Sequence, residues 1–525
     1  MKLTGFNFIG NELSGQGQEI FNAVNPATGK KLLPDFHGAT ADEINKAITQ
    51  AEHAFNNYSK KSGKEKALFL ETIAEEIEML GNNLIERCHE ETGLPKIRLV
   101  GERARTVNQL KLFAELLKEG AWVEARIETA IPDRQPVPKP DIRSMYKALG
   151  PVGIFGSSNF PLAFSVAGGD TSSALAAGCS VIFKAHPAHP GTCELIATAI
   201  INAVLKTKMP NGTFSMVHGK SNEVGMSIVS HPLIKAIGFT GSFRGGKAIY
   251  DAAVRRNEPI PVYAEMGSTN PVFILPGALR ERNEEIAKGL TASVTLGVGQ
   301  FCTNPGLVFF EESDEAEKFQ YAAIESFSNV TAGTMLSSEI QNAYQNGIKN
   351  ISNMPEIQIL AEGKTSGTIG EGIAYLFQTN AEEFLINEQL EEEIFGPSTL
   401  FVKSHKKSEL LKAAEKLHGH LTVTIHATKE DLEIYKDLIS ILERKAGRLI
   451  INGFPTGVEV CHSMVHGGPF PATTDSRTTS VGTLAINRFV RPVCYQNFPD
   501  ELLPDEIKNG NPLGIWRLVN GEWKK

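Results

Sequence analysis

The sequence predicts an α/β protein in which strands of a doubly wound parallel sheet alternate with helices. Three observations predict it. Apolar strand candidates separated by helical stretches follow Gly150, a second such series follows Pro271, and residues 41–117 repeat apolar side chains at three and four positions, as helices do. With 525 residues, 41% hydrophobic and 21% charged, the chain has a globular composition and a length that favours two to four domains.

Each element of this prediction has its own signal. The first series has apolar strand candidates joined by helical spacers, and crossovers of that length suit parallel strands. Its strand candidates are 152–155, 180–184, 214–219, 234–239 and 262–267, and its helical spacers include 193–205, 222–229 and 245–254. The second series has strand candidates at 271–276, 307–311, 398–403, 420–428 and 447–453. Between the early helices and the first strand series, four prolines within 122–146 indicate an exposed ribbon.

Charge and composition exclude several classes of protein. The net charge of −8 gives no basic field for nucleic acid or an anionic bilayer. We find no secretory signal in the first residues and no run of about 18 apolar residues, so we expect no export and no membrane span. The six cysteines form no CxxC pair, which argues against disulfides and a zinc knuckle. The sequence predicts a cytoplasmic protein with reduced thiols and no metal.

One segment could bind phosphate. Neither GxGxxG nor GxxxxGK[ST] is present, but Thr240-Gly241-Ser242 and two further glycines separate a strand candidate from a helix. Free backbone N–H groups at a helix start favour an anion, so this segment suits a pyrophosphate. It suits equally a glycine-rich turn in which Ser242 caps the helix.

Three residues are candidates for catalysis, and each also has an ordinary structural explanation. Cys302 lies among glycines and a proline, which makes it the best nucleophile candidate among the cysteines, although a lone cysteine is more often inert and buried. Glu265 ends an apolar strand, where a carboxylate either pairs or acts as a base with a raised pKa. Asn159 precedes Phe-Pro and could simply close a turn.

Seven segments taken in order decide between these interpretations. They are SSNFPLAF, VIFKAHPAHPGT, GFTGS, AEMGSTNP, GQFCTNPG, EEIFGP and GGPFPATTDSRTTSVG. Together they resemble the aldehyde dehydrogenase superfamily over nearly the whole chain. The resemblance implies two doubly wound parallel-sheet domains plus a protruding oligomerisation β-ribbon. It divides the chain into a dinucleotide-binding domain (1–134 and 151–267), a catalytic domain (268–466), and a ribbon with the C-terminal tail (135–150 and 481–525).

The resemblance also assigns roles. Cys302 matches the thiolate that attacks the aldehyde, Asn159 the oxyanion-binding amide, and Glu265 the base that activates water, a role that needs a pKa near the operating pH. Lys184 matches a residue of both the catalytic and the cofactor sites. The other expected cofactor contacts are His186, Pro187, Lys220, Gly241, Ser242, Gly267, Glu393 and Phe395. A homodimer or homotetramer is implied, because the ribbon would complete a neighbour's sheet.

The coenzyme prediction rests on one departure from the family pattern. Many NAD-preferring relatives have an acidic residue three positions after the lysine that matches Lys184, and this chain has Pro187 there. No carboxylate repels a 2′-phosphate, and His186 or Lys220 could attract it. We therefore expect NADP as coenzyme, with NAD as a second candidate.

The motifs resemble most a subgroup that oxidises 2,5-dioxopentanoate (α-ketoglutaric semialdehyde) to 2-oxoglutarate. The carboxylate of such a substrate requires a cation in the pocket, and Arg105 falls on the helix that lines the substrate tunnel in relatives. Its ordinary alternative is a solvated arginine paired with Glu102. Phe160, Phe164 and Phe470 are candidates for the apolar wall.

Two other functions remain open from the sequence. One is an NADP-dependent dehydrogenase for aliphatic or fatty aldehydes, which shares the subgroup pattern. The other is a cysteine thioesterase or esterase without redox chemistry, for which a nucleophilic cysteine and an oxyanion hole suffice. The second would turn over without coenzyme.

Overall fold

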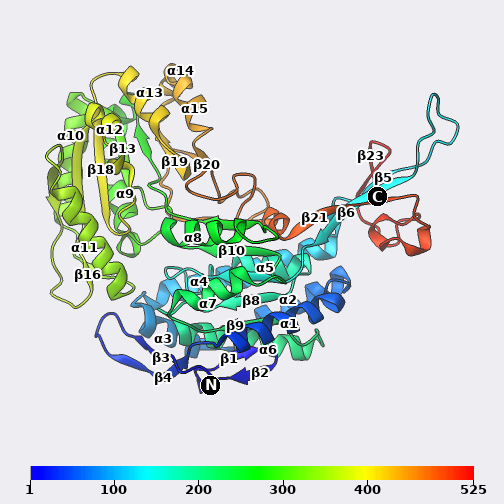
Figure 1. The fold of residues 1–525 in the computed structure, drawn as a ribbon. Helices are drawn as coiled ribbons and strands as arrows, with labels where there is room; N and C mark the ends of the chain where they lie inside the picture. Colours follow the sequence, from blue (N-terminus) through cyan, green and yellow to red (C-terminus); the bar gives the residue numbers. More distant parts are fainter. Residues whose placement is uncertain (1) are drawn as a thin grey trace.

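A computed structural model describes residues 2–525, which form two α/β domains and a projecting arm (Figure 1). The predicted fold class is confirmed: each domain has a seven-stranded, largely parallel sheet, and the arm carries a smaller sheet of five strands. None of the helices in the described residues is long and apolar enough to cross a membrane.

The N-terminal domain contains the first predicted strand series. Five parallel strands are extended at one edge by two antiparallel strands from the start of the chain, which the sequence did not predict. In sheet order the strands are β11 (Val262–Glu265), β10 (Ala236–Thr240), β7 (Val152–Phe155), β8 (Val181–Lys184), β9 (Phe214–Val217), β1 (Asn7–Ile9) and β2 (Glu12–Ser14). Because β10 follows β9 in sequence but lies beside β7, the strand order reverses between β7 and β10.

Helices cover both faces of this sheet, as a doubly wound fold requires. Side chains of one face form a core with α2 (Gly63–Met79), α4 (Lys96–Glu119), α5 (Gly169–Ala177) and α6 (Pro190–Lys206). Those of the other face pack against α1 (Ala41–Tyr58), α7 (Asn222–Ser230) and α8 (Phe243–Val254). The early helices include α3 (Gly81–Thr92), so the predicted helical region 41–117 is confirmed.

The second domain contains the second predicted series. Its strands, in sheet order, are β15 (Gln358–Glu362), β17 (Tyr375–Asn380), β18 (Ser398–Ser404), β13 (Leu307–Glu311), β12 (Val272–Ile274), β19 (His420–His426) and β20 (Ala446–Ile451). One face packs on α9 (Pro276–Thr295) and α10 (Asp314–Ser328). The other packs on α11 (Ser338–Ser352), α12 (Ala381–Ile386), α13 (Lys407–Lys416) and α15 (Lys436–Leu442), and α14 (Lys429–Ile434) contacts α9. The sequence did not predict β15 and β17.

The arm extends away from both domains (Figure 1). Its sheet has the order β21 (Val490–Gln496), β6 (Ile142–Ala148), β5 (Arg126–Glu128), β22 (Arg517–Val519) and β23 (Glu522–Lys524). The arm begins at β5, earlier than the expected boundary at 135, because β5 pairs with β6. Residues 483–489 form a 3-10 helix before β21 begins, so the start of the segment expected from 481 is not extended.

Two short pairs complete the described chain. The hairpin of β3 (Ile20–Val24) and β4 (Lys31–His37) lies beside the N-terminal domain, and β14 (Gly333–Thr334) pairs with β16 (Glu371–Gly372).

Candidate active site

Cys302 lies on the loop between α9 and β13, and a buried asparagine fixes that loop. Asn270 has a left-handed backbone, with φ of 46°, just before β12. Its side-chain amide donates to the carbonyl oxygens of Cys302 and Asn304, both at 2.9 Å. The loop is therefore tied to the connection between β11 and β12, and this connection begins next to Glu265.

Three side chains from distant parts of the chain meet at the sulfur. The Sγ of Cys302 lies 3.5 Å from Nε2 of His466, and that nitrogen lies 3.0 Å from Oε1 of Glu265. Glu265 and His466 are buried, whereas Cys302 is partly exposed. The Ser480 hydroxyl donates to the other oxygen of Glu265 at 2.7 Å. Both contacts are to the same imidazole nitrogen, so Nε2 of His466 lies between the thiol and the carboxylate, and its hydrogen bond to Glu265 holds the carboxylate near the sulfur.

The loop that carries His466 is built to reach the end of β11. The backbone N–H of His466 donates to the Thr479 hydroxyl at 2.8 Å, and the backbone N–H of Ser480 donates to the His466 carbonyl at 2.8 Å. Further along, Thr473 forms a β-bridge with Glu265. The loop thus closes on itself and is pinned to the strand that ends in Glu265.

The pKa shifts reflect this crowding. Burial raises the pKa of the Cys302 thiol well above its usual range, and the nearby Glu265 carboxylate raises it further. Burial would also raise the pKa of Glu265, but the attraction and hydrogen bond from His466, together with the Ser480 hydroxyl, lower it below its ordinary value. The sequence had suggested a raised pKa for this carboxylate. The downward shift follows because Glu265 is paired, which was the structural alternative for a carboxylate at a strand end.

Asn159 follows β7 and reaches the nucleophile loop. It is buried, and its side-chain amide donates to the carbonyl oxygen of Gln300 at 3.0 Å, two residues before Cys302. The guanidinium of Arg98 donates to the backbone carbonyl of Asn159 at 2.6 Å and so holds its backbone. The amide therefore lies beside the loop whose backbone N–H groups would share a substrate oxygen with it.

An aromatic wall with two arginines adjoins these groups. Phe160 contacts Phe164 edge to face at 5.4 Å between ring centroids, and Phe164 lies 5.9 Å from the His466 ring. Arg98 stacks on Phe160 at 5.0 Å, and Arg105 lies over Phe164 at 5.2 Å. Apolar and cationic surface are thus present together next to the candidate nucleophile.

Arg105 differs from its expected structural alternative. The Glu102 carboxylate accepts from the backbone N–H groups of Leu162 and Ala163 at 2.8 and 3.0 Å. Arg105 makes no ion pair with it among the described residues, and its Nε and one terminal nitrogen are buried without a hydrogen-bond partner. Burial lowers the pKa of Arg105, and the Glu102 charge, followed by those of Cys302 and Glu265, opposes the shift.

Phe470 does not join this aromatic wall. Its ring is 56% exposed and lies 6.0 Å from Phe243, the first residue of α8. This places Phe470 at the cofactor side of the N-terminal domain, away from Phe160 and Phe164, which pack with Val481 and Met464. Phe470 is close to His466 in sequence, but it does not share a pocket with Phe160 and Phe164.

The carboxyl ends of β7, β8 and β10 form the edge at which the strand order reverses, where open α/β sheets bind ligands. Lys184 ends β8, and burial lowers its pKa to about 8. Ser242 is the N-cap of α8, and its hydroxyl accepts a hydrogen bond from the Gly245 N–H at 3.2 Å. Ser242 and Gly241 are both exposed. The capping interpretation is correct, and it leaves the first N–H groups of α8 facing this edge.

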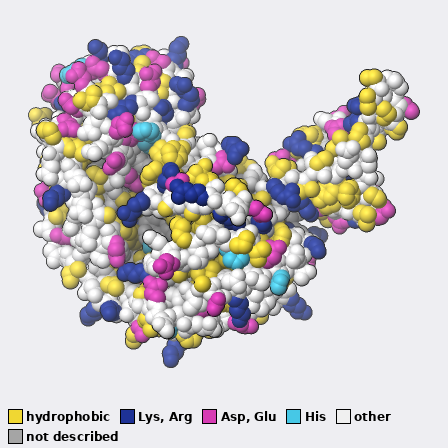
Figure 2. All heavy atoms as spheres, viewed as in Figure 1, with side chains coloured by type: hydrophobic (Ala, Val, Ile, Leu, Met, Phe, Trp, Pro, Cys, Tyr) yellow, Lys and Arg dark blue, Asp and Glu magenta, His cyan; other side chains and the backbone are white. Residues whose placement is uncertain are grey.

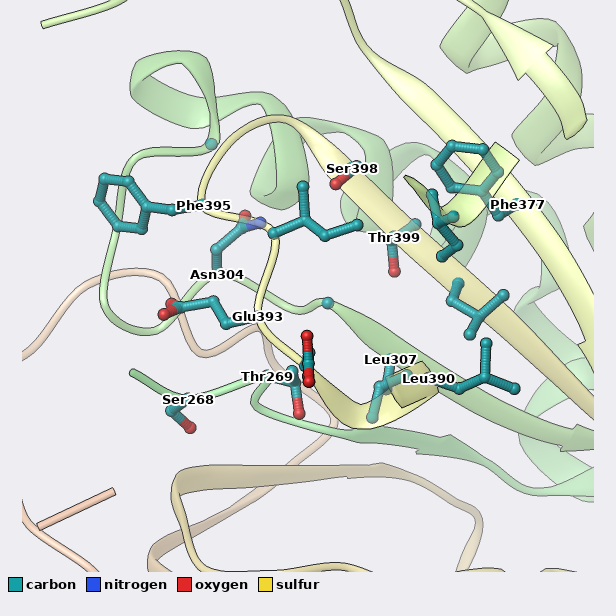
Figure 3. Close-up of a pocket in the computed structure, with 16 residues that line it drawn as sticks. Ser268, Thr269, Asn304, Leu307, Phe377, Leu390, Glu393, Phe395, Ser398 and Thr399 are labelled. Atoms are coloured by element: carbon teal, nitrogen blue, oxygen red, sulfur yellow. The ribbon is translucent and has the colours of Figure 1, made fainter. Parts of the chain in front are cut away.

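Glu393 and Phe395, on the loop before β18, line a pocket (Figure 3). Ser268, Thr269 and Asn304 line the pocket beside them. A Cβ atom at Gly267 would lie only 2.3 Å from Oε2 of Glu393, so a side chain at this position would displace the end of the Glu393 side chain. Glycine at 267 thus lets Glu393 approach the connection that follows β11.

Three expected cofactor contacts lie at one end of this edge. The His186 ring stacks on His189 at 5.3 Å, and burial with neighbouring His189 and Lys184 holds the pKa of His186 well below its ordinary value. His186 is therefore neutral at neutral pH, which corrects the expectation that it could attract a phosphate by charge. Pro187 is half-buried beside it. Lys220 follows β9, and its ammonium is 3.8 Å from Glu339 but 63% exposed.

Sequence reasoning missed His466, Ser480 and Asn270 as functional candidates. Asn270 and Ser480 are part of quoted motifs, and His466 directly precedes one of them. A histidine next to two glycines has no local signal of a role. His466 is 201 positions from Glu265 in the sequence, and only the fold brings it next to that carboxylate.

Comparisons with known proteins agree with this geometry. The α-ketoglutaric semialdehyde dehydrogenase 2 of Azospirillum brasilense is 47% identical over 99% of this chain and 100% of its own length. The α-ketoglutaric semialdehyde dehydrogenase of Acinetobacter baylyi is 49% identical over 98% of both chains. Among solved structures, a 1-pyrroline-5-carboxylate dehydrogenase from Thermus with bound NAD superposes with a TM-score of 0.78 at 21% identity, covering 94% of this chain and 92% of that one. Residues 13–469 match the aldehyde dehydrogenase family, and the chain therefore belongs to that family.

Proposed function

We propose that the protein oxidises α-ketoglutaric semialdehyde (2,5-dioxopentanoate) to 2-oxoglutarate, with NADP as the preferred coenzyme. The observation that carries the substrate assignment is Arg105, a half-buried guanidinium with two buried nitrogens that have no hydrogen-bond partner and with a charge that acts on Cys302. A buried donor without a partner is costly, and a substrate carboxylate would satisfy it. The two relatives that are 47% and 49% identical carry the same activity in their names.

In the first half of the reaction, the thiol must lose its proton. The Glu265 carboxylate, which lies within 4.8 Å of Sγ, would accept it, while Nε2 of His466 stays hydrogen-bonded to that carboxylate. The sulfur then attacks the aldehyde carbon. The amide of Asn159 and the backbone N–H of Cys302 would donate to the developing oxyanion. Acceptance of a hydride from this adduct is the chemistry that a bound nicotinamide coenzyme supplies.

In the second half, water must hydrolyse the thioester. Glu265 is ionised at neutral pH because its pKa is lowered, so it can accept a proton from water or orient the water through His466. Ser480 holds one carboxylate oxygen and His466 contacts the other, and together they fix the carboxylate near the sulfur. The Glu265–His466 pair would therefore serve both halves of the reaction.

The preference for NADP rests on the charges near Lys184. Pro187 stands where a carboxylate would repel a 2′-phosphate, and Lys220 lies three residues after the end of the neighbouring strand β9. Because the ammonium of Lys220 is largely exposed and its pairing with Glu339 is long, it is free to turn toward a phosphate. His186 contributes shape and not charge, since it is neutral.

The test is a substrate panel with each coenzyme. We expect kcat/KM with NADP to be highest for α-ketoglutaric semialdehyde, lower for pentanal, which lacks the acid, and lower again for decanal. A preference for decanal would favour a fatty-aldehyde enzyme. Hydrolysis of thioesters without coenzyme, with no aldehyde oxidation, would favour a cysteine hydrolase. Either result would overturn the proposal.

We also propose that the protein is a homodimer or homotetramer. β21 is an edge strand of the arm, and apolar side chains gather on the arm surface (Figure 2). The exposed ones in the arm and tail include Ile131, Val137, Leu502, Leu513, Trp516 and Trp523. An unpaired edge and an apolar surface favour a partner. Sedimentation equilibrium tests this, and a stable monomer at micromolar concentration would contradict it.

A further inference from the structure

The three side chains around the sulfur have a second chemical property. Cys302, His466 and Glu265 offer one sulfur, one nitrogen and one oxygen ligand atom, and these atoms all lie within 4.8 Å of one another. Within residues 2–525, no other group of three such side chains meets this condition. The set mixes thiolate, imidazole and carboxylate, which are the three ligand types that zinc accepts in proteins.

The separation of the sulfur and the imidazole nitrogen matches a tetrahedral ion. Zinc bonds of about 2.3 Å to sulfur and about 2.0–2.2 Å to nitrogen or oxygen, at tetrahedral angles, place ligand atoms about 3.3–3.6 Å apart. The Cys302 sulfur and the His466 Nε2 are 3.5 Å apart, within this range. The His466 nitrogen and the Glu265 oxygen are 3.0 Å apart, so a small rotation of one side chain would complete the geometry.

We propose that this cluster is a zinc-binding site and that zinc bound there reversibly inhibits the enzyme. The thiol proton leaves to solvent as the zinc–sulfur bond forms. The His466 ring binds through Nε2 in the neutral form with its proton on Nδ1, one oxygen of Glu265 completes three protein ligands, and water fills the fourth position. No oxidation or reduction takes place. Magnesium and calcium would not compete, because they prefer all-oxygen ligands.

Inhibition follows because the ion occupies the groups that the reaction needs. The sulfur can no longer attack an aldehyde, and Glu265 can no longer accept a proton. An aldehyde bound covalently to Cys302 would in turn exclude the ion. Cys302 is partly exposed, so the ion can reach it from solvent.

The surroundings predict moderate affinity, as expected of a reversible inhibitor. Nδ1 of His466 is buried without a hydrogen-bond partner, whereas resident zinc sites usually orient this second nitrogen. The Arg105 charge acts on Cys302 and would oppose a second cation. Because the thiol must be deprotonated, affinity should rise with pH by up to about tenfold per unit.

The test measures binding separately from catalysis, so it does not depend on the substrate assignment. Equilibrium dialysis of the NADP-loaded enzyme should find one Zn²⁺ per chain. Cd²⁺, which has similar chemistry, should produce an ultraviolet thiolate-to-metal band. Cys302→Ser should lose that band, and His466→Phe should weaken binding by about 10- to 100-fold. Cys461→Ser, at another partly exposed cysteine, should bind like the wild type.

Activity provides a second readout. Zn²⁺ should inhibit aldehyde oxidation, EDTA should restore it, and prior addition of excess aldehyde should protect. If His466→Phe does not fold, Glu265→Gln tests the same ligand set and should weaken zinc binding similarly. Wild-type affinity in the folded His466 or Glu265 variant would mean that the thiol binds zinc alone, and loss of the band in Cys461→Ser would place the ion elsewhere. Either result, or no stoichiometric binding, overturns the proposal.

Discussion

Replacing Arg105 with leucine tests the substrate pocket most directly. The guanidinium lies 5.2 Å from the Phe164 ring and 5.9 Å from the Phe160 ring, and its Nε and one terminal nitrogen have no hydrogen-bond partner. A hydrogen bond to a charged group contributes about 1.5–3 kcal/mol. Losing one such bond to the substrate carboxylate should lower kcat/KM for α-ketoglutaric semialdehyde by about 10- to 150-fold. Leucine packs on the two rings, so the apolar wall should remain.

The assay compares two aldehydes of equal chain length. Steady-state kinetics with α-ketoglutaric semialdehyde should show the full loss, mainly as a higher KM, because the contact is made in the ground state as well. Pentanal should change by less than about threefold, since it has no carboxylate. Arg103→Leu is the matched control, because Arg103 is on the same helix but donates to the Gly81 carbonyl. Equal losses for both aldehydes in Arg105→Leu would refute the assignment of a carboxylate contact.

Three further predictions concern the same site. His466→Phe should lower kcat by about 10²- to 10⁴-fold, because the carboxylate that accepts the protons loses the group that holds it in place. The acidic limb of the pH profile should move upward, because His466 holds the pKa of Glu265 down and that pKa would rise without it. An unchanged limb in steady-state profiles would contradict the pairing. Alkylation of Cys302 by iodoacetamide in the coenzyme-free enzyme should accelerate by up to about tenfold per pH unit from pH 7 to 9, without a plateau. The raised pKa keeps the thiol protonated at neutral pH, and only the thiolate reacts. Mass spectrometry of the modified peptide measures the rate, and a plateau below pH 8 would contradict the raised pKa. Pro187→Glu should raise KM for NADP by about tenfold or more through like-charge repulsion while KM for NAD changes less, and equal changes would mean that position 187 does not face the 2′-phosphate.

The sequence by itself determined the order of elements and two of the three groups at the sulfur. Alternating apolar runs and helical spacers are local patterns, so the strands from β7 to β11 and the helices α6, α7 and α8 could be predicted within a few residues, whereas α5 was not predicted. Cys302 and Glu265 could be found because motifs of fixed local spacing surround them. The short strands β1 and β2 could not, because three residues of strand carry no periodicity and pair only where the sheet edge already exists.

Only the tertiary structure decided which side chains share a site. It brings His466 to Glu265 across 201 positions and to Cys302 across 164. It also separates Phe470 from Phe164, and it leaves the Nε and one terminal nitrogen of Arg105 without a hydrogen-bond partner although Glu102 is on the same helix. The physical reason is that hydrogen bonds and pKa shifts depend on distances in space, and a chain that returns to a sheet edge from far along the sequence leaves no local pattern of where it will arrive.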